Sequence, residues 1–335
     1  MTDRSLALVT GASSGIGLEL ARQFADHGFD LIVNAEDTGL AAAAQQLRTS
    51  GATVQEVQAD LRSAEGVDAV WAAVGATGRP LAAAALNAGV GQGGAFVDTD
   101  IADEQEIIDT NVSSTVRLAK LVLRDMNSRG EGRVLFTSSI ASTMPGSFQA
   151  VYNASKSFVQ SFAEALQEEL KDSGVTITSL MPGPTETNFF HRADMDDTKV
   201  GASSKDSAEQ VAKQGFEALM KGEKKLVAGG LGTKAQGLAA KVLPDSVKGA
   251  MHRQMAEPGS AIDRCMPALT PPRPTSALSA AAASGRPVAV TAAWTCSTPS
   301  GVRKSARTAR TSVLTAAPSA VTAASRRLSS ALISR

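Results

Sequence analysis

The sequence predicts an α/β fold: a single doubly wound parallel sheet of about seven strands, with helices on both faces. Two observations lead to this prediction. Short apolar runs alternate with longer segments of helical spacing through residues 1–259, which is the pattern of βαβ units. Hydrophobic residues make up 43% of the 335 residues, enough to bury both faces of such a sheet.

The expected strands are the short apolar runs. A helix follows the first run and continues to about His27, and a longer helix covers about Ala150 to Ser173. The connecting segments are too short to form an independent second domain, so we interpret residues 1–259 as one domain. Strands are expected at residues 6–10, 31–35, 53–59, 81–87, 133–138 and 176–181, with a seventh at 224–228.

Residues 260–335 differ in composition from the rest of the chain. Ala, Ser, Thr, Pro and Arg dominate, and no periodic apolar face is present. Such a segment buries too little surface to offset the entropy of ordering, so we predict a low-complexity, basic and disordered tail. Two interpretations stay open: a basic tail attracted to anionic lipid or nucleic acid, or an extension outside the evolved domain, for instance from a shifted reading frame.

The charge is zero overall but unevenly distributed. Residues 260–335 hold 10 of the 33 basic residues and one of the 33 acidic residues, so the rest of the chain holds 23 basic and 32 acidic residues, a net charge of −9. An acidic body lacks the electrostatic footprint of a nucleic-acid-binding protein. We therefore expect no nucleic acid as a partner.

The cysteines and histidines give no sign of a metal site. Cys265 and Cys296 both lie in the tail, so the body has neither a disulfide framework nor a thiolate site. His27, His191 and His252 are too far apart to form a zinc motif, and each is expected to be a surface or capping residue. We predict that no metal is bound.

The N-terminal sequence has no charged-then-apolar leader, and no run approaches the roughly 18 apolar residues of a membrane span. The expectation is a cytoplasmic protein without a membrane partner.

A glycine-rich turn, TGASSGIG at residues 10–17, follows the first expected strand and opens a helix. Gly11 permits a tight turn, Gly15 lets the backbone approach a pyrophosphate, and Gly17 lets the helix pack closely on the sheet. The N–H groups and positive dipole at the helix N-terminus favour phosphates. Such turns also occur for structural reasons, and the spacing G-x-x-x-G-x-G differs from the commoner G-x-G-x-x-G. The motif indicates a Rossmann-type dinucleotide site once further residues support it.

Two carboxylates, Glu36 and Asp37, follow the second expected strand, and Glu36 stands 19 residues after Gly17. A carboxylate at this place accepts hydrogen bonds from both adenosine ribose hydroxyls and repels a 2′-phosphate. No Arg or Lys follows until Arg48. The residues favour NAD(H), with NADP(H) possible. The alternative is that both are solvated loop acids that open the next helix.

Tyr152 is the only tyrosine in the chain, and Lys156 follows four residues later on the expected long helix. Residues at i and i+4 project from one face of a helix. A phenol titrates near pH 10, and an adjacent ammonium favours the phenolate and lowers the pKa. The pair is therefore a candidate general acid and base, although Y-x-x-x-K alone is a pattern that arises by chance in many proteins.

Ser139 lies at the C-terminal end of an expected buried strand. Ligands of open α/β sheets bind at these strand ends, so the hydroxyl would face the same crevice as the glycine turn and could bind a carbonyl oxygen. Its neighbour Ser138 would point the other way in an extended strand. A serine that ends a strand is more commonly just a cap.

Together these motifs resemble the short-chain dehydrogenase/reductase family, over essentially all of residues 5–259. The matching segments are TGASSGIG, Asp60 in ADL, LNAGVG with Asn87 to Gly89, Asn111 in TNVSS, Ser139, the Tyr152–Lys156 pair, and MPGPTETNF at residues 181–189. Each is weak alone, but their order and spacing make the resemblance specific. It implies an NAD(P)-dependent oxidoreductase that interconverts a secondary alcohol and a ketone.

The resemblance also implies a role for each residue. Tyr152 would exchange a proton with the substrate oxygen, Lys156 would lower the tyrosine pKa and bind ribose hydroxyls, and Ser139 would orient the carbonyl. Asn111 would support a water that relays protons past Lys156. The implied cofactor site comprises Gly11, Ser13, Ser14, Gly15, Ile16, Gly17, Glu36, Asp60, Leu61, Asn87, Ala88, Gly89, Tyr152, Lys156, Pro182, Gly183, Thr185 and Thr187.

The substrate is less defined. Residues 188–222 fall in the variable lid of the family, where Phe189, Phe190 and Met195 could line an apolar pocket for a hydrophobic alcohol or ketone, or could simply pack the lid. The family implies a homodimer or homotetramer formed through its long helices. On the expected helix, the apolar residues that could form an interface or belong to the core are Phe158, Phe162, Ala165 and Leu166.

Two other classes of function remain at this stage. One is a non-catalytic Rossmann-type protein that binds a dinucleotide or senses its redox state, which would not require the Tyr152–Lys156 pair. The other is an interaction protein that acts through its basic tail.

Overall fold

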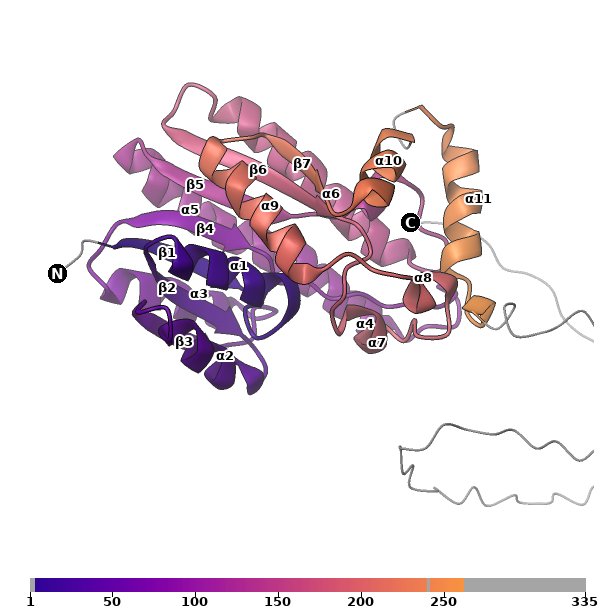
Figure 1. Cartoon of the computed structure of the whole chain (residues 1–335), viewed down its shortest axis with the longest axis horizontal. Coiled ribbons are helices and arrows are strands. Elements are labelled where there is room, and N and C mark those ends of the chain that lie inside the picture. The colour runs from indigo at the N-terminus through magenta and orange to yellow at the C-terminus, as the bar shows by residue number, and fades with distance from the viewer. Residues whose placement is uncertain (1–3, 240–241, 262–335) are drawn as a thin grey trace, which may run out of the picture. The chain divides into compact units, whose positions relative to one another are not determined.

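A computed structural model of the chain describes residues 4–239 and 242–261. Seven parallel strands form one sheet in the order β3-β2-β1-β4-β5-β6-β7 (Figure 1). The order reverses between β1 and β4, which is the switch point where open α/β sheets bind ligands. The strands are β1 (Ser5–Thr10), β2 (Phe29–Ala35), β3 (Val54–Gln58), β4 (Leu81–Leu86), β5 (Gly132–Thr137), β6 (Val175–Pro182) and β7 (Lys225–Ala228).

The helices cover both faces of the sheet because alternate residues of each strand face opposite sides. From β1, Ala7 and Val9 pack in a core with α1, α2 and α9, whereas Leu6 and Leu8 pack in a second core with α3, α5 and α6. These layers are formed by α1 (Gly15–Asp26), α2 (Gly39–Arg48), α3 (Ala64–Ala76), α5 (Ser114–Arg129), α6 (Ala150–Glu169) and α9 (Ala208–Lys221).

The remaining helices lie near the C-terminal ends of the strands (Figure 1). They are α4 (Ile101–Ile107), the π-helical turn η1 (Ile108–Ser113), the 3₁₀ turn η2 (Ile140–Thr143), α7 (Phe189–Arg192), α8 (Lys199–Ala202), α10 (Leu231–Ala239) and α11 (Asp245–Ala256).

The predicted fold class is confirmed. Each of the seven expected strands is present, with boundaries within two residues of the prediction. The predicted helix from Ala150 to Ser173 is too long, because α6 ends at Glu169. The chain must turn there to enter β6, and Gly174 passes so close to Gly130 that an added Cβ would lie 1.7 Å from its carbonyl oxygen.

The predicted tail, residues 260–335, lies outside the described residues except for its first two positions. The Ser260 hydroxyl accepts a hydrogen bond from the Lys199 backbone N–H at 3.0 Å, and the Ala261 N–H donates to the Asp197 carbonyl at 2.9 Å. Within the described ranges, none of the helices combines the length and apolar character needed to cross a bilayer.

Candidate active site

A cavity of about 500 Å³ lies at the C-terminal ends of the strands. Its wall consists of the glycine turn after β1, the segments after β2 to β6, and residues of α6, α7, α10 and α11. Ser139 and all of the cofactor residues predicted from the sequence line it; Asn111 does not. Those cofactor residues are Gly11, Ser13, Ser14, Gly15, Ile16, Gly17, Glu36, Asp60, Leu61, Asn87, Ala88, Gly89, Tyr152, Lys156, Pro182, Gly183, Thr185 and Thr187.

The glycine turn packs against its neighbours more closely than a side chain at these positions would allow. Gly11 and Gly15 have φ angles of 65° and 56°, which favour glycine. A Cβ on Gly15 would lie 2.8 Å from Thr187 Cγ2, and one on Gly17 would lie 2.0 Å from the Gly11 carbonyl oxygen. The close approach of the turn to helix α1 and to the loop after β6 therefore depends on these glycines.

The N-terminus of α1 opens onto the same cavity. Its N-cap residue, Ser14, makes no side-chain capping bond, and the first turn contains no acidic residue. The first N–H groups and the positive end of the helix dipole are thus available to an anion. This donor set fits the pyrophosphate of a dinucleotide.

The loop after β4 is held at the switch point by its two neighbouring strands. Buried Thr10 of β1 accepts hydrogen bonds from the backbone N–H groups of Asn87 and Ala88 at 3.0 and 3.1 Å, and Thr137 of β5 donates to Asn87 Oδ1 at 3.0 Å. Thr10 and Thr137 were not singled out from the sequence, because a threonine within a strand carries no distinctive local pattern.

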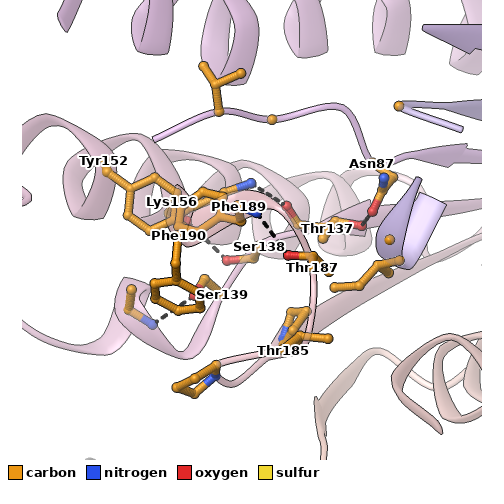
Figure 2. A pocket seen from close by; sticks show the side chains of 18 of the residues that line it. Asn87, Thr137, Ser138, Ser139, Tyr152, Lys156, Thr185, Thr187, Phe189 and Phe190 are labelled. Atoms are coloured by element: carbon orange, nitrogen blue, oxygen red, sulfur yellow. Dashed lines mark hydrogen bonds between the residues drawn. The ribbon is translucent and has the colours of Figure 1, made fainter. Parts of the chain in front are cut away.

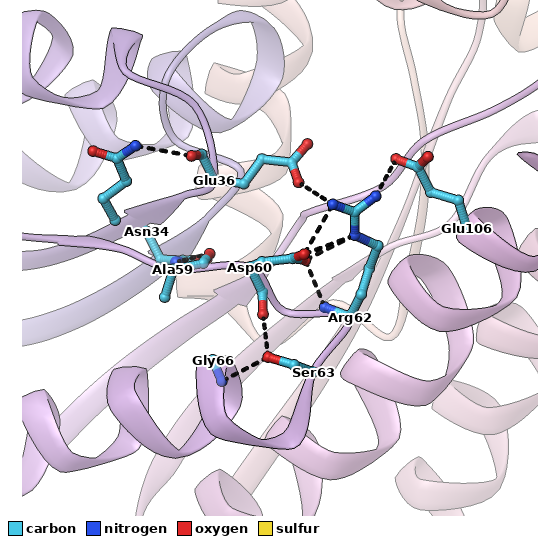
Figure 3. Close-up of polar contacts among 9 residues, drawn as sticks. Asn34, Glu36, Ala59, Asp60, Arg62, Ser63, Gly66 and Glu106 are labelled. Atoms are coloured by element: carbon cyan, nitrogen blue, oxygen red, sulfur yellow. Dashed lines mark hydrogen bonds and ion pairs between the residues drawn. The ribbon is translucent and has the colours of Figure 1, made fainter.

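Three carboxylates gather at the end of the cavity formed by β2 and β3. Asp37 accepts a hydrogen bond from the Ser13 hydroxyl at 2.6 Å, which ties the glycine turn to the end of β2. Glu36 and Asp60 both contact the Arg62 guanidinium, at 3.3 and 2.8 Å (Figure 3). Hydrogen bonding from Arg62 lowers the pKa of Asp60. Arg62 was missed in the sequence because it is close to Glu36 only in space.

Ser139, Tyr152 and Lys156 meet at the other end of the cavity (Figure 2). Ser139 follows β5, while Tyr152 and Lys156 lie one turn apart on α6, as predicted. The Lys156 Nζ atom is 5.9 Å from the centroid of the Tyr152 ring and donates a hydrogen bond to the Thr137 carbonyl at 3.0 Å. Lys156 is only 5% exposed.

The pKa values of the two groups correct one prediction. Burial raises the pKa of Tyr152 to about 12, although hydrogen bonding with Ser139 works in the opposite direction. Burial lowers the pKa of Lys156 to about 8. The net shift of the Tyr152 pKa is therefore opposite to the expected lowering, because desolvation of the phenol is its largest cause. At neutral pH the phenol is protonated and can donate.

The loop after β6 closes the cavity between these two ends. Gly183 approaches Thr233 of α10 so closely that a Cβ would lie 2.6 Å from that side chain. Thr185 donates a hydrogen bond to the Gly183 carbonyl at 2.9 Å, and Thr187 accepts one from the Phe189 N–H at 3.2 Å. Thr187 therefore packs beside Gly15 of the glycine turn and also binds the first residue of α7.

Asn111 is fully buried in the π-helical turn η1 and does not reach the cavity surface. Its amide exchanges two hydrogen bonds of 2.9 Å with the backbone of Val90 and donates a third to the Ser155 hydroxyl at 2.9 Å. The observed role of this side chain is to join the loop after β4 to α6, one residue before Lys156.

Aromatic and sulfur-containing side chains line the cavity beyond Tyr152. The ring of Phe189 lies 5.1 Å from that of Tyr152 between centroids, and Phe190 also lines the cavity. Of the two alternatives left open for Met195, lid packing holds, since this residue does not line the cavity. Met195 is fully buried in a cluster with Phe190 and Ala256. It packs directly against Gly93, where an added Cβ would lie 2.5 Å from the Met195 side chain.

Helix α11 forms a wall that the sequence analysis missed. Lys248, Met251, His252 and Met255 line the cavity, and their spacing of three, one and three residues places them on one helix face. That spacing was the available signal. The expectation that His252 is a surface or capping residue is wrong: the side chain lines the cavity, contacts the Ser147 carbonyl at 3.1 Å, and burial lowers its pKa.

The other two histidines lie away from the cavity, as expected. His27 contacts the Gln23 carbonyl at the end of α1, and His191 is 80% exposed and contacts Asp196. In the part of the chain that the structure describes, no group of three or more His, Cys, Asp or Glu residues is arranged to hold a metal ion.

Comparison with known proteins agrees with this geometry. Residues 5–198 match the family model described as short chain dehydrogenase. The chain belongs to the short-chain dehydrogenase/reductase family. It is accordingly an oxidoreductase that acts on CH–OH donors with NAD(P).

Two named relatives illustrate the similarity. A Streptomyces coelicolor protein named "Putative ketoacyl reductase" is 36% identical over 190 residues, which cover 55% of this chain and 72% of the relative. The Escherichia coli 3-oxoacyl-[acyl-carrier-protein] reductase FabG is 31% identical over 197 residues, or 58% of this chain and 79% of the relative.

Solved structures of the family carry either form of the cofactor. A short-chain dehydrogenase from Sphingobium yanoikuyae in complex with NADPH has a TM-score of 0.62 at 30% identity, covering 66% of this chain and 86% of the other. One from Burkholderia phymatum in complex with NAD has a TM-score of 0.61 at 26% identity, covering 67% and 88%. The family resemblance therefore identifies NAD(P) as the cofactor class without choosing between its two forms.

Proposed function

We propose that this protein interconverts an apolar secondary alcohol and the corresponding ketone, with NAD(H) as the preferred cofactor. The observation that carries the proposal is the convergence of Ser139, Tyr152 and Lys156 on one cavity that also contains the glycine turn and the N-terminus of α1. When bound there, the nicotinamide dinucleotide supplies or accepts the hydride.

The residues of this chain handle the proton and the position of the substrate. Tyr152, protonated at neutral pH because burial raises its pKa to about 12, donates its proton to the carbonyl oxygen during reduction and takes it back during oxidation. Ser139 donates a hydrogen bond to the same oxygen. Lys156, whose burial lowers its pKa to about 8, binds ribose hydroxyls and supports the charge that develops on the phenol.

An apolar substrate is favoured by the far wall of the cavity. Phe190, Met144 and Leu243 line it together with Met251 and Met255. Such a surface gains most from burying apolar groups, and methionine adapts to varied shapes. Relatives named as a ketoacyl reductase and a 3-oxoacyl-[acyl-carrier-protein] reductase support a ketone as the group that is reduced.

NAD(H) is favoured over NADP(H) by the charge at the adenosine end. Glu36, Asp37 and Asp60 stand there, and a 2′-phosphate would bring further negative charge beside them. A ribose diol instead offers two hydroxyl donors to a carboxylate. Arg62, a cation of this region, already contacts Glu36 and Asp60.

Homo-oligomer formation is part of the proposal and concerns α6. Of the apolar residues expected either at an interface or in the core, Phe162 and Leu166 pack against the core that includes Phe136, whereas Phe158 is 41% exposed and stacks on Phe162 with ring centroids 5.8 Å apart. Light scattering of the eluting protein would give the oligomeric state, and a monomer at all concentrations would contradict this part of the proposal.

The Tyr152→Phe variant tests the proposed chemistry. The substitution removes the hydroxyl and keeps the ring that contacts Phe189, so the fold and NAD binding should persist while turnover falls by about 10²–10⁴-fold, the usual effect of a positioned proton donor. Turnover is measured with a panel of alcohols and ketones and both cofactors, from the absorbance of the reduced dinucleotide.

Two outcomes would count against the enzyme proposal. Unchanged turnover in Tyr152→Phe would remove the phenol from the mechanism. Tight dinucleotide binding by the wild type without turnover of any panel member would favour a redox-sensing protein. Removal of residues 262–335 serves as a control: persistent turnover would show that activity does not depend on this segment.

A further inference from the structure

Arg62 connects three segments that are far apart in the sequence. Its guanidinium contacts Glu36 after β2 at 3.3 Å, Asp60 after β3 at 2.8 Å and Glu106 on α4 at 3.0 Å (Figure 3). The Arg62 Nε atom lies 2.9 Å from each carboxylate oxygen of Asp60. Both the spacing of these contacts and the shape of the guanidinium suit simultaneous contact with several carboxylates.

The position of Arg62 relative to the cavity is informative. Glu36 and Asp60 line the main cavity, while Arg62 does not. Glu36 and Glu106 also line a smaller neighbouring cavity, together with Asp103 and Arg192. Arg62 therefore contacts the two acids that face the adenosine end, and its guanidinium donors are engaged by these carboxylates.

This arrangement has two consequences for binding. The Glu36 side chain is 46% exposed, and an exposed glutamate without a partner would sample several rotamers. Contact with Arg62 restricts it to one position, which lowers the entropy cost of binding a ribose diol. The same contacts use the positive charge that a 2′-phosphate would need.

We infer that Arg62 is a positioning residue that sets the choice between NAD and NADP: it orients Glu36 toward the ribose hydroxyls, and it becomes a ligand for a 2′-phosphate once Glu36 loses its charge. This inference rests on the proposed dinucleotide site. The preference therefore depends on the Glu36–Arg62 pair and not on Glu36 alone.

The experiment measures the affinity of the full-length protein for NAD⁺ and NADP⁺ by titration calorimetry, which needs no turnover. Arg62→Met keeps the length of the aliphatic chain and removes the charge; it should weaken NAD⁺ binding about tenfold, since it removes charge-assisted contacts that orient Glu36. Arg62→Lys keeps the charge and should restore part of this loss. A purely electrostatic background effect would instead be restored in full by lysine, which keeps the charge and lacks only the planar guanidinium.

The second part uses Glu36→Gln, which should tighten NADP⁺ binding by about 10–100-fold because a repulsive charge is removed and Arg62 loses one of its three carboxylate contacts. In the double variant Glu36→Gln, Arg62→Met, most of this gain should disappear. The matched control is Arg48→Met. Arg48 is a comparably exposed arginine that contacts Glu56 at 3.9 Å and lies outside the cavity lining, so this variant should bind both dinucleotides as the wild type does.

The inference is overturned if Glu36→Gln gains the same NADP⁺ affinity with and without Arg62, or if Arg62→Met binds NAD⁺ as tightly as the wild type. In both cases the dinucleotide site itself would stand. Failure of the wild type to bind either dinucleotide would instead refute the proposed function and, with it, this inference.

Discussion

Replacing Lys156 with methionine should make the protein inactive without making it less stable. Lys156 is 5% exposed, and its Nζ atom donates one hydrogen bond, to the Thr137 carbonyl at 3.0 Å. Methionine has a similar length and an uncharged side chain, so its burial carries no cost of removing a charge from water. The substitution removes a charge whose burial is unfavourable and, with it, the ammonium on which the proposed chemistry depends.

The size of the effect follows from the pKa of Lys156. Burial lowers it from 10.5 to about 8, a difference of 2.5, which corresponds to about 3 kcal/mol of unfavourable free energy at pH 7. Methionine relieves this penalty but leaves the Thr137 carbonyl without its donor, which costs about 1–3 kcal/mol. The net gain in the free energy of unfolding at pH 7 is therefore about 0–2 kcal/mol.

The pH dependence separates the cost of the buried charge, which changes with pH, from the cost of the lost hydrogen bond to Thr137, which does not. Between pH 8 and pH 10.5 the unfolded chain holds the Lys156 proton while the folded chain does not, so the stability of the wild type rises with pH in this window. The methionine variant lacks this rise. The difference in unfolding free energy between variant and wild type should therefore shrink by about 2 kcal/mol between pH 7 and pH 9.5.

The assay is guanidinium denaturation of both proteins at pH 7, 8 and 9.5, followed by circular dichroism. The tyrosine titration cancels in the comparison because both proteins contain Tyr152, whose folded-state pKa is raised by burial to about 12, above the range used. A difference between the two proteins that is the same at all three pH values would refute the reasoning, because it would show that Lys156 binds its proton equally in the folded and unfolded states.

Two further substitutions probe the cavity. In Gly17→Ala a Cβ would lie 2.0 Å from the Gly11 carbonyl oxygen; we expect a displaced turn and at least about tenfold weaker NAD⁺ binding by calorimetry, whereas Gly75→Ala, where nothing lies within 4 Å, should leave binding intact. Met251→Ala should raise the KM for bulky apolar ketones about threefold to tenfold by removing apolar contact, with kcat for small ketones unchanged. Val247→Ala, on the same helix but outside the cavity lining, is its control, and equal KM changes in both would refute the assignment of this wall.

The strands and the glycine turn could be predicted because their signals are local. An apolar run of five to eight residues followed by a helical segment has few structural alternatives in an α/β chain. The tyrosine and lysine on α6 met as predicted for the same reason, since a helix places residues i and i+4 together whatever surrounds it.

The undecided and the mistaken predictions share a different cause. Local pattern did not distinguish Met195, which fills the space beside Gly93, from Phe190, which lines the cavity. His252 was expected at the surface and instead lines the cavity, because its exposure depends on where α11 packs. Helix α6 ends at Glu169, and five residues later Gly174 approaches Gly130, a contact between distant segments that no local pattern shows.

The amino-acid sequence by itself determined the order of the strands along the chain, the glycine turn, and the residues that could exchange a proton. These depend on periodicity and on intrinsic backbone preference, which neighbouring residues decide. Only the tertiary structure decided the pKa values of Tyr152 and Lys156, because desolvation depends on everything packed around a group. It also brought the three carboxylate partners of Arg62 together, because they lie on segments that are distant in the sequence and close only in the folded chain.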